Sequence, residues 1–93
     1  MDRPSLYEWD EAKRRANFAK HRVDFAAAED FDWLTALVAE DQRRDYGEAR
    51  SVALGRIGAI VHVLIFVARS DRIRIISLRK ANSKETARYA NSF

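Results

Sequence analysis

The sequence predicts an α+β domain with an N-terminal strand, two helices, an antiparallel sheet and a C-terminal helix, in that order. Three observations lead to this class. Alanines recur at helical spacing over residues 11–21, three stretches suited to strands follow one another from residue 50 with short turns between them, and a polar stretch closes the sequence. The 93 residues, 47% of them apolar, are enough for one domain spanning 1–93 with a modest core.

The N-terminal region is predicted to form a strand and then a helix. Residues 6–9 alternate between apolar and polar side chains, which indicates a short strand at a sheet edge. Asp10 suits the N-cap of a helix over residues 11–21, and Glu11 in its first turn complements the helix dipole. We expect this helix to pack closely through a narrow face of small residues, which are Ala12, Ala16 and Ala19.

Two charged residues mark the end of this helix and the start of the next. Arg22 stands where helices often end in glycine, so a left-handed conformation there costs roughly 1 kcal/mol. Asp24 then suits the N-cap of a second, short helix. The buried side of that helix is expected to consist of three apolar residues, Phe25, Ala28 and Phe31.

The rest of the sequence predicts a series of strands and then a helix. The expected strands cover residues 35–40, 50–57, 60–69 and 72–78, with a charged turn over 41–47. The stretch 60–69 is apolar on both faces, which indicates a central strand. Short turns at Gly58 and at 70–71 predict an antiparallel meander, and a polar helix is expected over 83–89.

The composition excludes several classes of protein. The absence of cysteine rules out disulfides and thiolate metal sites, and the two histidines, His21 and His62, are too far apart in sequence to suggest a metal centre. His62 lies among apolar residues and is interpreted as buried. No targeting segment opens the sequence, and the longest apolar run, 59–68, is too short to span a bilayer, so we expect a cytoplasmic protein without a cofactor. The net charge of +3 favours an anionic partner.

Arginines around the last predicted strand are the strongest indication of function. Strict alternation places Arg79 on one face with Ile73, Ile75 and Ser77, and places Arg72 and Arg74 on the other face with Ile76 and Leu78. Arg69 and Arg50, which end and begin neighbouring strands, are expected on the same sheet. Fixed guanidinium groups bind phosphate well. Long arginine stems also cover apolar surface at strand ends, and this second interpretation stays open.

Two further side chains are candidates for proton transfer. Glu48 shares a strand face with Arg50, and ion pairing is the better interpretation because a guanidinium neighbour stabilises a carboxylate and weakens it as a base. His21 closes the first helix, whose C-terminus favours the charged imidazole. It is either a general acid or base, or a structural cap.

Three blocks of residues carry a resemblance to a known family. The first block is Glu8-Trp9-Asp10-Glu11-x-Lys13, then Asn17, then Lys20-His21-x-Val23-x-Phe25. The second is Gly47-Glu48-x-Arg50 followed by Ala53-Leu54-Gly55. The third is Ile73-Arg74-Ile75-Ile76-Ser77-x-Arg79-Lys80-Ala81, with Glu85, Arg88 and Tyr89 after it. In this order the blocks span almost the whole sequence and resemble the signature of the BrnT toxins.

The resemblance implies a RelE-like fold and the toxin of a type II toxin–antitoxin system. Such a toxin is a ribonuclease that inhibits translation. RNA cleavage of this kind can use the substrate's own 2′-hydroxyl and needs no metal ion. The resemblance further implies neutralisation by a BrnA-type antitoxin, contact with promoter DNA only through the antitoxin complex, an oligomeric state within that complex and no membrane partner.

The matching positions also suggest residue roles. We expect Arg79 and Arg69 to flank the scissile phosphate with Arg50 nearby, because a planar guanidinium can hold two phosphate oxygens. Glu48 and His21 are the candidates for proton transfer. The RNA backbone is expected to follow four other cations, which are Lys20, Lys80, Lys84 and Arg88.

The sequence departs from the family pattern beside Arg69. Phe66-Val67-Ala68-Arg69 stands where many members have tyrosine, threonine, glutamate and arginine. A tyrosine or carboxylate role at this strand end is therefore lost. The alternative interpretation is a weakened or inactive toxin-derived module that binds its antitoxin or RNA without cleaving.

Overall fold

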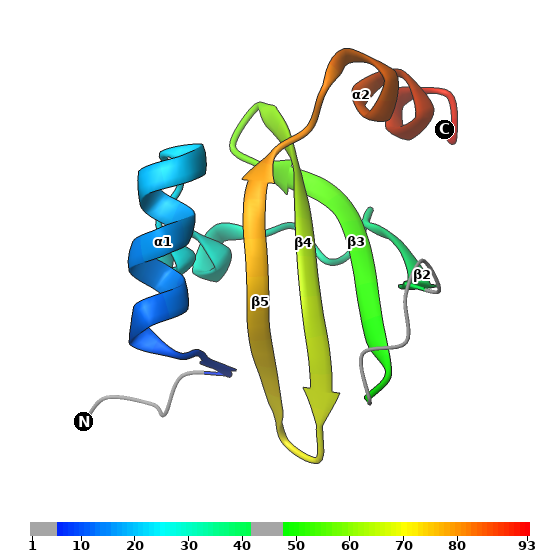
Figure 1. The fold of residues 1–93 in the computed structure, drawn as a ribbon. Helices are drawn as coiled ribbons and strands as arrows, with labels where there is room; N and C mark the ends of the chain where they lie inside the picture. The colour runs from blue at the N-terminus through cyan, green and yellow to red at the C-terminus, as the bar shows by residue number, and fades with distance from the viewer. Residues whose placement is uncertain (1–5, 42–47) are drawn as a thin grey trace, which may run out of the picture.

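The computed structural model describes residues 6–41 and 48–93, which form one five-stranded sheet with helices on both of its faces (Figure 1). The strands are β1 (Tyr7–Glu8), β2 (Leu37–Asp41), β3 (Arg50–Ile57), β4 (Ile60–Arg69) and β5 (Arg72–Lys80). The helices are α1 (Glu11–His21), the 3₁₀ helix η1 (Phe25–Asp30) and α2 (Ser83–Ala90). This arrangement confirms the α+β class. The turn expected over 41–47 lies outside the described residues from position 42 onward.

The sheet follows the order β1-β5-β4-β3-β2. Strands β2 to β5 form the expected antiparallel meander, with Gly58 in a left-handed conformation (φ 62°) at the turn between β3 and β4. The expectation of a wholly antiparallel sheet is wrong, because β1 pairs parallel to β5, with Tyr7 opposite Ile73. The β2 strand begins two residues later than expected, and β5 continues to Lys80 rather than ending at residue 78.

The two ends of α1 form as expected. The Asp10 carboxylate accepts hydrogen bonds from the backbone N–H groups of Ala12 at 2.8 Å and Lys13 at 3.3 Å. Arg22 adopts the left-handed conformation with φ 60°, and its N–H donates to the carbonyl of Phe18 at 2.8 Å. These caps fix the length of α1 and turn the chain toward η1.

The packing face of α1 differs from the expected one. The three alanines at positions 12, 16 and 19 are exposed, whereas Asn17 is buried with 8% of its surface accessible. The Asn17 amide donates to the Leu78 carbonyl at 2.7 Å and accepts from the Leu78 N–H at 3.2 Å, and it also donates to the Val23 carbonyl at 3.0 Å. Because β1 covers only the start of β5, the rest of this strand edge has backbone groups to satisfy, and α1 supplies an amide rather than an apolar stripe.

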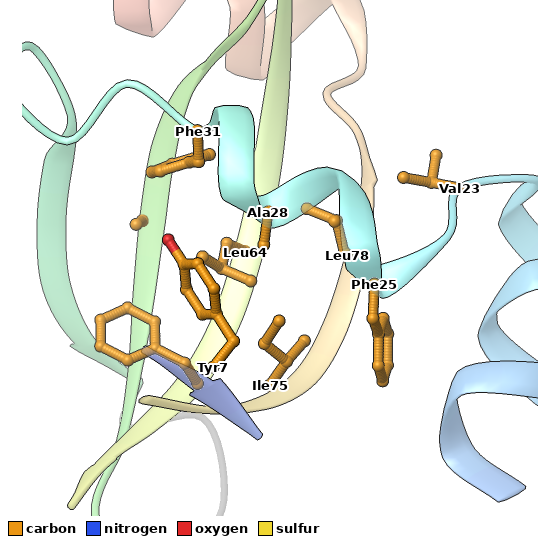
Figure 2. Packing of buried hydrophobic residues seen from close by; sticks show 10 residues of the cluster. Tyr7, Val23, Phe25, Ala28, Phe31, Leu64, Ile75 and Leu78 are labelled. Carbon is orange, nitrogen blue, oxygen red and sulfur yellow. The ribbon is translucent and has the colours of Figure 1, made fainter. Parts of the chain in front are cut away.

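The main core lies between the sheet and η1 (Figure 2). Asp24 caps η1 by accepting from the Ala26 N–H at 2.9 Å, and the expected apolar side of η1 is buried, with Phe25 and Ala28 fully inside. Phe31 packs on Gly55, where an added Cβ would lie 2.5 Å from the phenyl ring. The small residue at position 55 therefore allows η1 to lie close to β3.

The ladder between β4 and β5 contains an irregularity that periodicity does not reveal. Ile65 lies opposite Ser77, yet the next residue along β4, Phe66, lies opposite Ile75. Ile76 is therefore an extra residue on β5, which is the geometry of a β-bulge. The bulge reverses the alternation of side chains along the second half of the strand.

This reversal overturns the predicted faces of β5. Ile75 and Leu78 both lie fully buried in the core on the η1 side. Arg79 therefore points to the opposite side of the sheet, together with Arg72 and Arg74. The prediction that Arg79 shares a face with Ile73 and Ile75, opposite Arg72 and Arg74, is wrong because it assumed an unbroken strand.

A second, smaller core lies on the other side of the sheet under α2. It contains Leu54, Val61, Val63 and Tyr89. The Tyr89 hydroxyl is 2.7 Å from the Thr35 hydroxyl, which ties α2 to the segment before β2. Figure 1 shows α2 near the end of the sheet where β5 finishes.

We predict that Asn17→Ala destabilises the fold by about 2–4 kcal/mol, because it leaves the N–H and carbonyl of Leu78 buried without their amide partner. Urea unfolding followed by circular dichroism measures this loss. Asn91→Ala, at an exposed position after α2, is the matched control and should change the free energy of unfolding little. Equal losses in the two variants would contradict the role assigned to Asn17.

Candidate functional site

One face of the sheet gathers six arginines from three strands. We call it the arginine face; it carries Arg50, Arg56, Arg69, Arg72, Arg74 and Arg79. The register establishes this grouping, since Arg79 lies opposite Val63, Arg69 lies opposite Arg72, and alternate residues of β4 share a face. The apolar residues among these arginines are those of the core under α2.

The arginine face has two ends. Arg79 lies opposite Val63, and Arg69 is six residues further along β4, so their Cα positions are about 20 Å apart at roughly 3.3 Å per residue. Arg50 begins β3 one residue before the Ser51–Phe66 pair, which places it toward the Arg69 end. The structure thus brings Arg50 toward Arg69 and separates both from Arg79.

Carboxylates accompany the arginines at the Arg69 end. Glu48 forms an ion pair with Arg69 at 3.7 Å, and Glu8 pairs with Arg74 at 3.3 Å. The pairing interpretation of Glu48 is therefore confirmed, with Arg69 as its partner. Both side chains of that pair are substantially solvated, so the contact adds little stability and leaves Arg69 accessible to another anion.

At the other end of the arginine face, Arg79 forms a bidentate ion pair with Glu85. The two terminal nitrogens of Arg79 donate to the two carboxylate oxygens of Glu85 at 2.8 and 2.9 Å. One of these nitrogens also lies 3.3 Å from the Lys80 carbonyl. The hydrogen bonds from Arg79 lower the pKa of Glu85 to about 2, against 4.5 for an ordinary glutamate. Glu85 is therefore a carboxylate at any physiological pH.

Glu85 also belongs to the N-terminal cap of α2. The Asn82 side chain accepts from the Glu85 N–H at 2.8 Å, and Glu85 accepts from the Asn82 N–H at 2.9 Å. Sequence reasoning did not assign a role in the site to Glu85. The spacing Asn82-x-x-Glu85 is a capping-box signal, but it does not reveal that the same carboxylate reaches Arg79.

Next to this pair, a groove crosses the face of the sheet from α2 and β5 to β2. Its volume is about 320 Å³. Val52, Val63 and Ile65 are among its lining residues, with Arg79, Glu85 and Arg88 at one side and Ala39, Glu40 and Asp41 at the other. The groove therefore has an apolar floor and walls of mixed charge, with two guanidinium groups and a carboxylate on one side and two carboxylates on the other.

His21 lies near the same end of β5. Figure 1 shows α1 running alongside β5, so the C-terminal end of the helix approaches the end of the strand. Burial lowers the pKa of His21, and the positive charges of Lys20 and Arg79 lower it further. The expectation that the helix end favours the charged imidazole is therefore wrong, because burial and the neighbouring cations favour the neutral form.

The remaining predicted cations surround this end of the molecule. Lys80 lies opposite His62 and so points to the face opposite Arg79. Lys84 and Arg88 lie on α2, where both line a hollow of about 690 Å³ on the helix surface. Lys20 lines a groove of about 240 Å³ between α1 and β5, together with Lys13, Asn17 and His21. These cations come from three elements and are grouped around the end of β5.

Other features of the described residues concern structure rather than chemistry. His62 is buried, as expected, and its Nδ1 lies 2.8 Å from the Ile60 carbonyl. Within residues 6–41 and 48–93, three or more histidine, aspartate or glutamate side chains never gather as a metal site would need. The helices of that part are all too short or too polar to cross a membrane.

Comparison with models of known protein families gives a match. The model of the family described as "Ribonuclease toxin, BrnT, of type II toxin-antitoxin system" matches residues 9–85. No curated protein matches the chain. The matched span contains α1, all of β2 to β5 and the first turn of α2, and so includes both ends of the arginine face.

The lowered pKa of Glu85 predicts a pH dependence of stability. Because its folded pKa of about 2 lies below the ordinary 4.5, the pair with Arg79 stabilises the fold above pH 4.5 and this contribution is lost as the pH falls toward 2. Thermal unfolding of the native chain and of Glu85→Gln, measured from pH 7 to pH 2, should show a difference in Tm that shrinks over this window. A difference that stays constant down to pH 2 would contradict the assignment.

Proposed function

Because the chain belongs to the BrnT family of ribonuclease toxins of type II toxin–antitoxin systems, we propose that it cleaves RNA without a metal ion at the end of β5. The observation that carries this location is the placement of Arg79. The bulge in β5 turns its guanidinium toward the groove beside α2, where Arg88 also lies. A rigid strand that delivers an arginine into a groove beside a second arginine suits the binding of a phosphodiester.

In this proposal Arg79 binds the scissile phosphate. A planar guanidinium can donate to two phosphate oxygens at once and stabilise the charge that builds up on them during cleavage. Lys84 and Arg88 on α2, Lys20 on α1 and Lys80 at the strand end then bind flanking phosphates. Arg69 and Arg50, about 20 Å away along the sheet, bind a more distant part of the same RNA instead of the same phosphate.

The cleavage itself would use the RNA's own 2′-hydroxyl. Its oxygen attacks the neighbouring phosphorus as its proton passes to a base. The bond from phosphorus to the 5′-oxygen breaks, and that oxygen takes up a proton. The products are a 2′,3′-cyclic phosphate and a 5′-hydroxyl end. His21 is the proposed base, because burial and the nearby charges of Lys20 and Arg79 lower its pKa and so favour the neutral imidazole, which can accept a proton. Glu48 is the weaker candidate, since it is paired with Arg69 at the other end.

The biological setting that we propose follows from the family. The toxin would have a RelE-like fold, inhibit translation by destroying RNA, and be neutralised by a BrnA-type antitoxin. Promoter DNA would be bound only through the antitoxin, within an oligomeric complex. The type II toxin–antitoxin description of the matching family supports a protein partner and an RNA target.

A second candidate function is a toxin-derived module that binds RNA or its antitoxin without cleaving. The sequence beside Arg69 favours it, because Ala68 supplies no carboxylate and Phe66 supplies no hydroxyl. Phe66 is instead buried in the main core. RNA cleavage by the purified chain in the presence of a chelator decides between the two candidates.

We predict that Arg79→Ala lowers the rate of RNA cleavage by at least about a hundredfold, because it removes the cation proposed to stabilise the phosphate. The measurement uses purified protein, single-stranded RNA and excess chelator. Arg15→Ala, which removes one exposed arginine from α1, is the matched control and should retain activity.

Each alternative result has a clear meaning. Equal activity in Arg79→Ala and Arg15→Ala would contradict the assignment of Arg79. Cleavage that disappears for every variant once the chelator is added would contradict the metal-independent mechanism. RNA binding that depends on Arg79, without cleavage by the native chain, would favour the second candidate.

A further inference from the structure

Glu85 occupies the positions on Arg79 that a phosphate would need. Both terminal nitrogens of the guanidinium donate to its carboxylate, at 2.8 and 2.9 Å. A carboxylate and a phosphate bind this fork in the same way, through two parallel hydrogen bonds. RNA therefore meets Arg79 already bound to an internal anion, and the two anions compete for one cation.

The position of Glu85 is supported by Asn82 as well as by Arg79. Its carboxylate accepts from the Asn82 N–H at 2.9 Å, and its own N–H donates to the Asn82 side chain at 2.8 Å. This reciprocal cap holds the side chain at the start of α2. Arg79 can therefore exchange one partner for the other while α2 stays folded and Glu85 stays in place.

The surroundings of Glu85 also stabilise its carboxylate when Arg79 is no longer bound to it. Arg88 lies one helical turn further along α2, and its positive charge stabilises the Glu85 carboxylate. Glu85 lies at the wall of the groove with about a quarter of its side chain accessible to solvent. Loss of Arg79 would therefore leave a carboxylate that water, Asn82 and Arg88 still stabilise, rather than a buried unpaired charge.

We propose that Glu85 is a positioning residue that holds Arg79 toward the groove in the free protein and is displaced from it by an RNA phosphodiester. This inference rests on the proposed function, since it takes Arg79 to be the residue that binds the phosphate. Glu85 keeps the Arg79 side chain extended in one geometry, which reduces the conformational entropy lost when RNA binds. It also competes with RNA for the guanidinium, which weakens the affinity for RNA. Only an anion that offers two oxygens in the right geometry replaces it well.

The test compares Glu85→Gln with a charge-matched control. Glutamine retains the acceptor that the capping box uses, so α2 is expected to remain folded, but it binds a guanidinium much less strongly than a carboxylate does. Glu11→Gln is the control, because Glu11 forms the same kind of paired contact with Arg14 on the exposed side of α1, at 2.9 Å. Both variants remove one negative charge, so general attraction to RNA rises equally.

The measurement is the affinity for a short fluorescent RNA whose 2′-hydroxyl groups are methylated and which therefore cannot be cleaved. We expect Glu85→Gln to bind it roughly five- to tenfold more tightly than Glu11→Gln does, because the competing charged contact is gone. Adding Arg79→Ala to Glu85→Gln should remove this gain. Helix content from circular dichroism verifies that α2 is intact in each variant.

The outcomes separate this inference from the proposed function. If Glu85→Gln binds no more tightly than Glu11→Gln while Arg79→Ala weakens binding, Glu85 is a structural clamp and the exchange is refuted. A gain that persists after Arg79 is removed refutes the exchange as well. If Arg79→Ala binds RNA as tightly as the native chain, the proposed RNA site is itself wrong.

Discussion

The pairing of the Asn17 amide with the backbone of Leu78 is the contact on which the arrangement of the site depends. It joins the middle of α1 to the exposed edge of β5 through a donor and an acceptor on one side chain. The residue after Leu78 is Arg79, so a strand edge fixed at one position fixes the direction of the next side chain. The same contact brings the end of α1, with His21 and Lys20, beside the end of the strand.

Local signals in the sequence were sufficient for most of the fold. The caps of α1 and η1, the left-handed Arg22 and the central position of β4 follow from side-chain chemistry within a few residues. The bulge at Ile76 could not be predicted in this way, because it is a property of the pairing between β4 and β5 rather than of either strand alone. Strict alternation along β5 ignores this one extra residue and therefore assigns Arg79 to the wrong face of the sheet. The prediction of the packing face of α1 was wrong for a related reason, since the spacing of alanines carries no information about a strand edge elsewhere in the chain.

In the candidate site, too, some features could be predicted from the sequence and others required the tertiary structure. Residue types and the family resemblance proposed Arg79 and the cations around it as candidates, and the family membership is confirmed. The distance between Arg69 and Arg79 required the strand register, and the partnership of Arg79 with Glu85 required the path of the chain between β5 and α2. The pKa of His21 also depended on tertiary structure, because its burial and its neighbour Arg79 come from packing of α1 on the sheet. Charge patterns in a sequence locate such a site but do not pair its members.

The long separation of Asn17 from Leu78 has a consequence for synthesis of the protein. The two partners are 61 positions apart along the chain. A growing polypeptide therefore exposes the Asn17 amide through the appearance of η1, β2, β3 and β4, and closes this contact only when β5 emerges. The groove beside α2 needs still later residues, Glu85 and Arg88. For a protein of a toxin family, this order means that a truncated or stalled chain lacks the surface on which toxicity would depend, and that the surface forms as one of the last events of folding.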